Sequence, residues 1–250
     1  MSRILNDLFN TLLDGNVLQV LIGLHWTAVV AAVDGEQRCG LASTLSTPYH
    51  IHGEADVPQA GQLADMSARA LAGLARSEQP LLAGVGIAAI NALLQPPPEP
   101  MVDLNAEEVL ATHGAGKKVA LIGHFPFVPR LRPRVGELWV LEQNPQPGDL
   151  PADSAPERLP DAEVVAITGT TLINHTLDNL LAYCSPQATV ILLGPSTPLS
   201  PVLFDRKQSG GIDILCGSVV FDIPPVLRTI GQGGTFRQVR RAGVRPVTMT

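Results

Sequence analysis

The second half of the chain repeats a short apolar run followed by a glycine or a polar motif, and this repeat limits the possible folds more than any other feature. The runs are Val119–Ile122, Leu138–Leu141, Val164–Ile167, Val190–Leu193 and Ile212–Leu215. Runs that are short and apolar throughout are typical of strands buried on both faces of a parallel sheet. Segments that favour helices, Leu172–Tyr183 and Pro198–Asp205, lie between the later runs. We therefore predict a βαβ series, and hence a parallel α/β domain with right-handed crossovers.

The first two runs have the spacing of a dinucleotide-binding motif without its glycines. Glu142 lies 19 positions beyond Gly123, close to where a doubly wound sheet places the acid that binds a ribose. The first loop reads Gly123-His124-Phe125-Pro126, so it lacks the G-x-G-x-x-G pattern that lets the backbone approach a pyrophosphate. This stretch predicts a nucleotide-binding architecture whose loop accommodates another ligand.

The first hundred residues predict a different architecture. We expect a helix at 2–14, strands at 17–24, 27–33 and 38–42, and helices at 62–75 and 80–94. Asp34-Gly35 is a strong signal for a hairpin turn between the second and third strands. Together these elements predict an α+β domain that precedes the parallel sheet.

The consecutive prolines within 95–100 cannot continue a helix and form a stiff connector, so they are the best domain boundary. We expect an α+β domain over residues 1–98 and an α/β domain over residues 99–250. The polar, proline-rich stretch 145–160 is expected to be a loop or lid. The tail 236–250, which contains several arginines, is expected to be a solvated strand or an oligomer contact.

Composition excludes several classes of protein. Hydrophobic residues make up 45% of the chain and charged residues 16%, which excludes a disordered protein. A net charge of −6 disfavours a general binder of nucleic acid or of anionic membranes. The three cysteines are widely spaced and fit a reducing compartment, and no apolar stretch is suited to spanning a bilayer. We expect a soluble, cytoplasmic protein with no membrane span and no nucleic-acid partner.

Every predicted parallel strand is followed by residues that could contact a ligand. The motifs are Gly123-His124-Phe125, Glu142-Gln143-Asn144, Thr168-Gly169-Thr170-Thr171, Gly194-Pro195-Ser196-Thr197 and Cys216-Gly217-Ser218. Because the carboxyl ends of parallel strands meet at one edge of the sheet, and ligands bind there, these motifs predict a site.

Individual residues of these motifs suggest different chemistry. His124 could donate a hydrogen bond, move a proton or ligate a metal. Thr170 or Thr171 could cap the following helix, whose free N–H groups can hold an anion. For Asn174, a ligand contact and a structural role both remain open. Ser196 does not fit a hydrolase nucleophile, because no histidine follows it in the chain.

Several motifs resemble one known family. GHFPF, the E-x-x-P of Glu142–Pro145, TGTTLINHTLDNLL and GPSTPLSP are similar to the C-terminal part of the heavy-metal chelatase family, a group of unknown function. GLHWTAV and GIAAINALL are similar to the domain that precedes it. The resemblance implies an enolase N-terminal-like domain, then a Rossmann-like domain, with a site in the cleft between them. The cleft residues that it implies are Gly123, His124, Phe125, Glu142, Thr170, Thr171, Asn174, Gly194, Pro195 and Ser196, with Trp26, Thr27 and Asn91 from the first domain.

Three functions remain open from the sequence, and whether the chain is an enzyme is undecided. The first is a small-ligand site for a metal ion, a metal complex or an anionic metabolite, with His124 and Glu142 as ligands of a divalent or heavy-metal ion. The second is an enzyme that binds a nucleotide or an S-adenosylmethionine-like cofactor. The third is a non-enzymatic sensor or partner of a metal transport system. We expect a homodimer by default.

Overall fold

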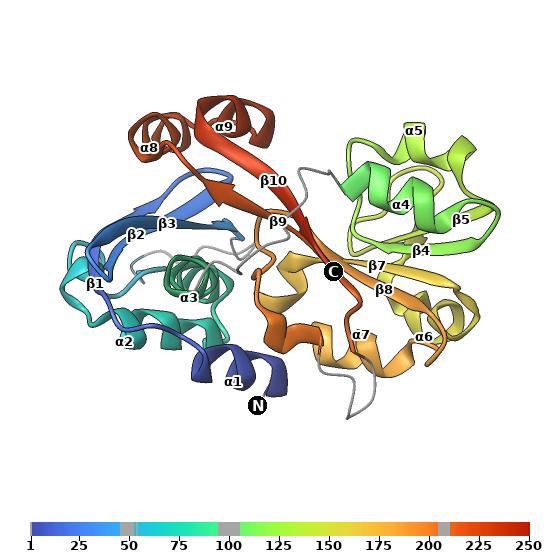
Figure 1. Cartoon of the computed structure of the whole chain (residues 1–250), viewed down its shortest axis with the longest axis horizontal. Coiled ribbons are helices and arrows are strands. Elements are labelled where there is room, and N and C mark those ends of the chain that lie inside the picture. Colours follow the sequence, from blue (N-terminus) through green and yellow to red (C-terminus); the bar gives the residue numbers. More distant parts are fainter. Residues whose placement is uncertain (1, 46–52, 54, 95–105, 205–210) are drawn as a thin grey trace.

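The computed structural model describes residues 2–45, 53, 55–94, 106–204 and 211–250, which form two sheets with helices packed against them (Figure 1). The first sheet is an antiparallel meander of β1 (Asn16–Ile22), β2 (Trp26–Val33) and β3 (Glu36–Ser43). Asp34 and Gly35 both have positive φ, 52° and 82°, as a two-residue hairpin turn of this hand requires. Helices α1 (Arg3–Asn10), α2 (Ala68–Gly73) and α3 (Pro80–Leu93) belong to this half of the chain.

The second sheet has seven strands, ordered β10-β9-β8-β7-β4-β5-β6. They are β4 (Lys118–Ile122), β5 (Glu137–Glu142), β6 (Leu150–Pro151), β7 (Val164–Thr168), β8 (Thr189–Leu193), β9 (Ile214–Val220) and β10 (Val244–Met249). All neighbours pair in parallel except β10, which runs antiparallel to β9. If the strands of this sheet are numbered from 1 in chain order, their spatial order is the doubly wound 3-2-1-4-5-6 with a seventh strand, β10, at the edge. Successive strands are therefore added on one side of β4 up to β6 and on the other side from β7 onward. The predicted fold class, an antiparallel meander with helices followed by a mostly parallel α/β sheet, is confirmed.

The helices of the second half are α4 (Ala106–Gly114), α5 (Val128–Leu131), α6 (Ala155–Arg158), α7 (Leu177–Tyr183), α8 (Ile223–Gly231) and α9 (Phe236–Gly243). Short 3-10 turns occur at Leu63–Asp65, Leu74–Arg76, Arg132–Arg134, Ala152–Ser154, Leu159–Asp161, Gly169–Leu172 and Pro201–Phe204. In the described part of the chain, none of the helices has the length and apolar character needed to cross a membrane.

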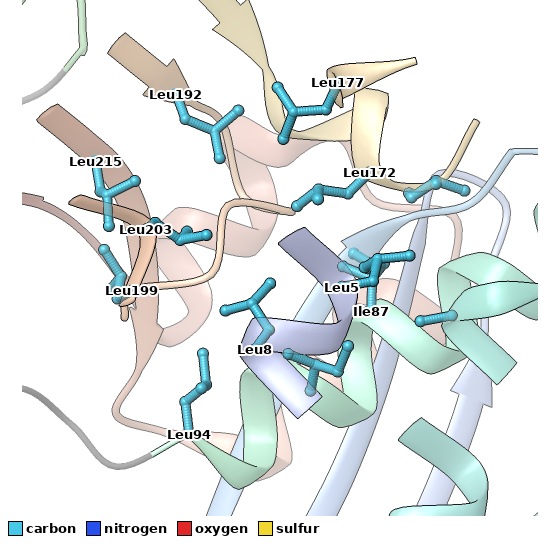
Figure 2. Packing of buried hydrophobic residues seen from close by; sticks show 14 of the residues in the cluster. Leu5, Leu8, Ile87, Leu94, Leu172, Leu177, Leu192, Leu199, Leu203 and Leu215 are labelled. Carbon is cyan, nitrogen blue, oxygen red and sulfur yellow. The ribbon is translucent and has the colours of Figure 1, made fainter. Parts of the chain in front are cut away.

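The largest cluster of buried side chains joins the two halves of the chain. Figure 2 shows Leu5 and Leu8 of α1 together with Ile87 of α3 and leucines from the second half, among them Leu172 and Leu203. A separate cluster packs α8 and α9 of the second half against the first sheet. The first sheet is therefore covered by helices from both ends of the sequence. The predicted boundary at 95–100 lies outside the described residues, and the division into domains at residue 98 stays a prediction.

Several segments differ from what the sequence predicts. The helix expected at 62–75 is divided into α2 and two flanking 3-10 turns, because Met66 is extended with a ψ of 148°, and of the helix expected from Pro198 the described residues form only the 3-10 turn Pro201–Phe204. The expected loop or lid at 145–160 contains β6 and α6, because Leu150 pairs with β5 and Ala155 is buried. The tail forms α9 and β10, and Val247, Thr248 and Met249 at its end are buried, so it is not a solvated strand. The helix expected from Leu172 begins at Leu177, since His175 has a φ of 59° and interrupts it.

Replacing Leu8 by alanine tests the shared core. Leu8 is fully buried, so the variant should lose about 2–5 kcal/mol of unfolding free energy through lost burial and the cavity that remains. Leu18→Ala is the matched control because Leu18 is 46% exposed, and it should cost less than about 1 kcal/mol. Urea unfolding followed by circular dichroism measures both, and equal losses would contradict the packing described.

Candidate functional site

A cleft of about 510 Å³ lies at the carboxyl ends of β4, β5, β7 and β8, where the first sheet also contributes to its wall. We call it the strand-edge cleft. The predicted site residues that line it are Gly123, His124, Phe125, Glu142, Thr170, Thr171, Asn174, Gly194, Pro195, Ser196 and Trp26. The structure thus brings together eleven of the thirteen residues that the sequence singles out. Thr27 and Asn91 are not part of its lining.

Glycines turn the chain where two of the strands reach the cleft. Gly123 and Gly194 have φ of 101° and 107°, a region that other residues rarely adopt. Their N–H groups donate to the carbonyls of Leu141 and Cys216 on the neighbouring strands, 2.9 Å away in each case. These turns end the strands sharply and place the following residues, His124 and Pro195, in the cleft wall.

The His124 ring is held by a carboxylate that the sequence analysis did not identify. Its Nδ1 lies 2.8 Å from Oδ2 of Asp149, whose side chain is only 2% exposed. Because an ionised carboxylate only accepts hydrogen bonds, Nδ1 is the donor of this bond, and in the neutral ring the lone pair then lies on Nε2. No described residue bonds Nε2. The ring therefore presents an oriented nitrogen acceptor in a wall of the cleft.

The Glu142 side chain holds the same loop by accepting hydrogen bonds from backbone N–H groups. Its two carboxylate oxygens accept the N–H groups of His124 and Gln143, each at 2.8 Å. The carboxylate thus fixes the position of His124 relative to the end of β5. Its predicted role as a metal ligand stays a prediction, since each oxygen still has a second lone pair.

The threonine-rich turn after β7 is organised by residues other than those expected. Thr168 is the cap: its hydroxyl oxygen accepts from the N–H of Thr170 at 3.4 Å, and Thr171 donates its own hydroxyl to the Thr168 carbonyl at 2.7 Å. Asn174 accepts from the N–H and hydroxyl of Thr176, at 3.3 and 2.7 Å, directly before α7. Asn174 thus lies in the turn before α7, and its amide nitrogen bonds no described residue.

Ser196 joins the two sheets at the base of the cleft. Its hydroxyl accepts the N–H of Ser43 at 2.9 Å and donates to the Ser43 hydroxyl at 3.2 Å. Asn91 of α3 donates to the carbonyls of Leu41 and Ser196, at 2.8 and 3.4 Å. Thr27 is buried and pairs with the hydroxyl of Thr44 at 2.9 Å. Asn91 and Thr27 thus support the wall from behind.

Three buried polar atoms around this wall have no hydrogen-bond partner among the described residues. They are Nε1 of Trp26, Oδ1 of Asn91 and Oγ1 of Thr197. An unpaired buried polar group costs about 1–3 kcal/mol, so such groups concentrate where a structure serves something other than stability. Thr197 belongs to the motif after the fourth predicted parallel strand, which the sequence already singled out.

The donor set does not fit a bare metal ion held by protein alone. In the ranges that the structure describes, no three His, Cys, Asp or Glu side chains gather where they could hold a metal. Burial raises the pKa of the Cys39 and Cys184 thiols to about 12 and that of Cys216 to about 11, and none of the three lines the strand-edge cleft. In the strand-edge cleft, the candidate metal ligands that remain are His124 and the free lone pairs of Glu142. Such a set fits a metal that brings most of its own ligands.

Comparison with known families confirms the resemblance seen in the motifs. Residues 105–249 match the model of the DUF364 family, which is described as "Putative heavy-metal chelation". Residues 6–94 match a second family, DUF4213, with the same description. The two matches cover the elements on both sides of the strand-edge cleft.

Three similar proteins are described as uncharacterized or of unknown function. An uncharacterized protein of Methanocaldococcus jannaschii is 27% identical over 232 residues, which cover 90% of this chain and 87% of that protein. A crystal structure of a DUF364 protein of unknown function from Desulfitobacterium hafniense has a TM-score of 0.80 at 26% identity and covers 99% of this chain and 97% of its own. Another, from Pyrococcus horikoshii, has a TM-score of 0.80 at 22% identity, with 99% and 98% covered, and shows the fold alone.

Replacing Ser196 by alanine tests the contact between the sheets. The change leaves the N–H of Ser43 without its acceptor, so the unfolding free energy should fall by about 1–3 kcal/mol. Ser185→Ala is the matched control, because that hydroxyl bonds only Gln187 at the surface, and its cost should stay within about 0.5 kcal/mol. Thermal unfolding measures both. A Ser196→Ala variant as stable as the control would show that this contact does not join the halves.

Proposed function

This chain belongs to the DUF364 family, and we propose that its strand-edge cleft binds a metal complex, with Nε2 of His124 as a ligand of the metal. The observation that carries the proposal is the 2.8 Å hydrogen bond between the His124 ring and the buried Asp149 carboxylate. Metal-ligating histidines nearly always donate their other ring N–H to such a partner, which fixes the tautomer and makes the free nitrogen more basic. The description of the family as heavy-metal chelation agrees with this role.

The proposal favours a metal complex over a bare ion for two reasons. The first is the number of donors: His124 and Glu142 are too few to satisfy a tetrahedral or octahedral ion, so the ion must keep other ligands. The second is size. A cleft of about 510 Å³ lies within the range for small organic ligands, whereas a structural metal site encloses little more than the ion.

The remaining lining of the cleft fits the organic part of such a complex. The free amide nitrogen of Asn174, Gln143, Asn144 and the hydroxyl of Thr170 offer neutral hydrogen-bonding groups. The described lining contains no lysine or arginine, so an anionic group would be held here by neutral donors and not by an ion pair. Phe125 and Trp26 add an apolar wall.

Nucleotide binding is the second candidate because the strand order reverses beside this cleft. Doubly wound sheets bind nucleotides at such a switch point. Against it, the loop after β4 lacks the glycines of the phosphate-binding motif, and both oxygens of Glu142 accept backbone N–H groups. A thermal shift of several degrees with NAD or S-adenosylmethionine, and none with a metal complex, would favour this candidate.

Titration calorimetry with nickel nitrilotriacetate tests the metal-complex proposal, because this chelate leaves open positions that an imidazole can fill. The wild type should bind it, and His124→Ala should bind at least about tenfold more weakly. Asp149→Asn should weaken binding by about 10–100-fold, as is usual when the partner of a ligating histidine is lost.

His113→Ala is the matched control, since His113 lies in the last turn of α4 and does not line the cleft. Its affinity should equal that of the wild type. The proposal is wrong if His124→Ala and His113→Ala bind the chelate with the same affinity as the wild type.

A further inference from the structure

A second cavity, of about 710 Å³, lies beside the strand-edge cleft and shares Trp26, Phe125, Gly194 and Pro195 with it. Its lining residues come from α9 and β10, from α4 and α5, and from the middle of β9. Four arginines contribute to its lining: Arg130, Arg237, Arg240 and Arg241. We call it the arginine-rimmed cavity.

Flat aromatic rings make up much of the apolar lining of this cavity. Phe125 and Phe127 stack with ring centroids 5.1 Å apart and an angle of 15° between their planes. Trp26 and Phe236 are in contact at 5.2 Å with their rings tilted by 50°. Aromatic faces that line a concave site favour a ligand with a flat apolar body.

The arginines of α9 give the cavity a positive rim. Arg237, Arg240 and Arg241 are exposed, and none forms an ion pair with a described residue. Arg130 differs, because it pairs with Glu107 at 2.7 Å. Three unpaired cations beside one cavity are unexpected in a chain whose net charge is −6. Arginine binds carboxylate and phosphate groups in a two-pronged geometry, so this rim suits an anion.

We propose that the arginine-rimmed cavity binds an organic anion with a flat apolar body, whose carboxylate or phosphate groups reach the arginines of α9. Its volume lies within the range for small-molecule sites, and three arginines of α9 contribute to its lining. The site goes beyond the proposed metal function and does not require it. Since the two cavities share a wall, one ligand could also occupy both.

Binding of the fluorescent dye 8-anilinonaphthalene-1-sulfonate, an anion with an apolar aromatic body, tests this site in the full chain. The wild type should show saturable binding that weakens as ionic strength rises. Arg237→Gln, Arg240→Gln and Arg241→Gln combined should weaken it by about tenfold. The matched control removes three positive charges elsewhere, by Lys117→Gln, Lys118→Gln and Arg228→Gln, and should change the affinity by less than about twofold.

A pair of neighbouring substitutions on β9 tests the location. Ser218 lines the cavity, whereas Val219, the next residue of the strand, does not. Ser218→Trp should fill the cavity and reduce affinity by at least about tenfold, whereas Val219→Trp should leave it within about twofold. His124→Ala should also bind the dye normally, so failure of this site and failure of the metal proposal are distinguishable.

Competition identifies the anionic group. Displacement of the dye by 2-naphthoate supports a carboxylate ligand, and displacement by naphthyl phosphate supports a phosphate ligand. The proposal is overturned if the wild type shows no saturable binding, if neither competitor displaces the dye, or if the arginine triple variant binds as tightly as its charge-matched control.

Discussion

The central strands β4 and β7 are buried on both faces, and most of the site follows from this constraint. Every residue from Val119 to Ile122 and from Val164 to Ile167 is buried, so polar side chains have no place along these strands and gather where the strands end. The order of the strands reverses between β4 and β7, which opens a space beside their ends. The loop containing His124 and the turn containing Thr168 meet there.

The sequence predicted the strands well because burial on both faces leaves an unmistakable apolar run, and it predicted the Asp34-Gly35 turn because few residues adopt positive φ. It missed Asp149 because that residue lies in a proline-rich stretch without periodicity. The start of α7 was placed too early because the apolar residues continue through the turn at His175. The packing of α8 and α9 on the first sheet depends on contacts distant in sequence, which no local pattern predicts. The homodimer and the cytoplasmic location stay predictions.

Two carboxylates position His124. Glu142 holds its backbone N–H, and Asp149 holds its ring, so one residue is fixed both in position and in orientation. Ser196 and Asn91 then fix the first sheet against the opposite wall. Beyond Phe125 and Pro195, the arginine-rimmed cavity offers apolar surface and positive charge. The two cavities differ in chemistry: one presents an oriented nitrogen beside the Glu142 carboxylate and neutral polar groups, and the other presents aromatic rings with cations at the rim.

Anomalous diffraction from crystals soaked in nickel nitrilotriacetate tests the central claim most directly, because it locates the metal. A nickel peak should lie about 2 Å from Nε2 of His124, with the ring still bonded to Asp149 and the chelate within the strand-edge cleft. Peaks on other histidines, with none beside an ordered and accessible His124, would contradict the account.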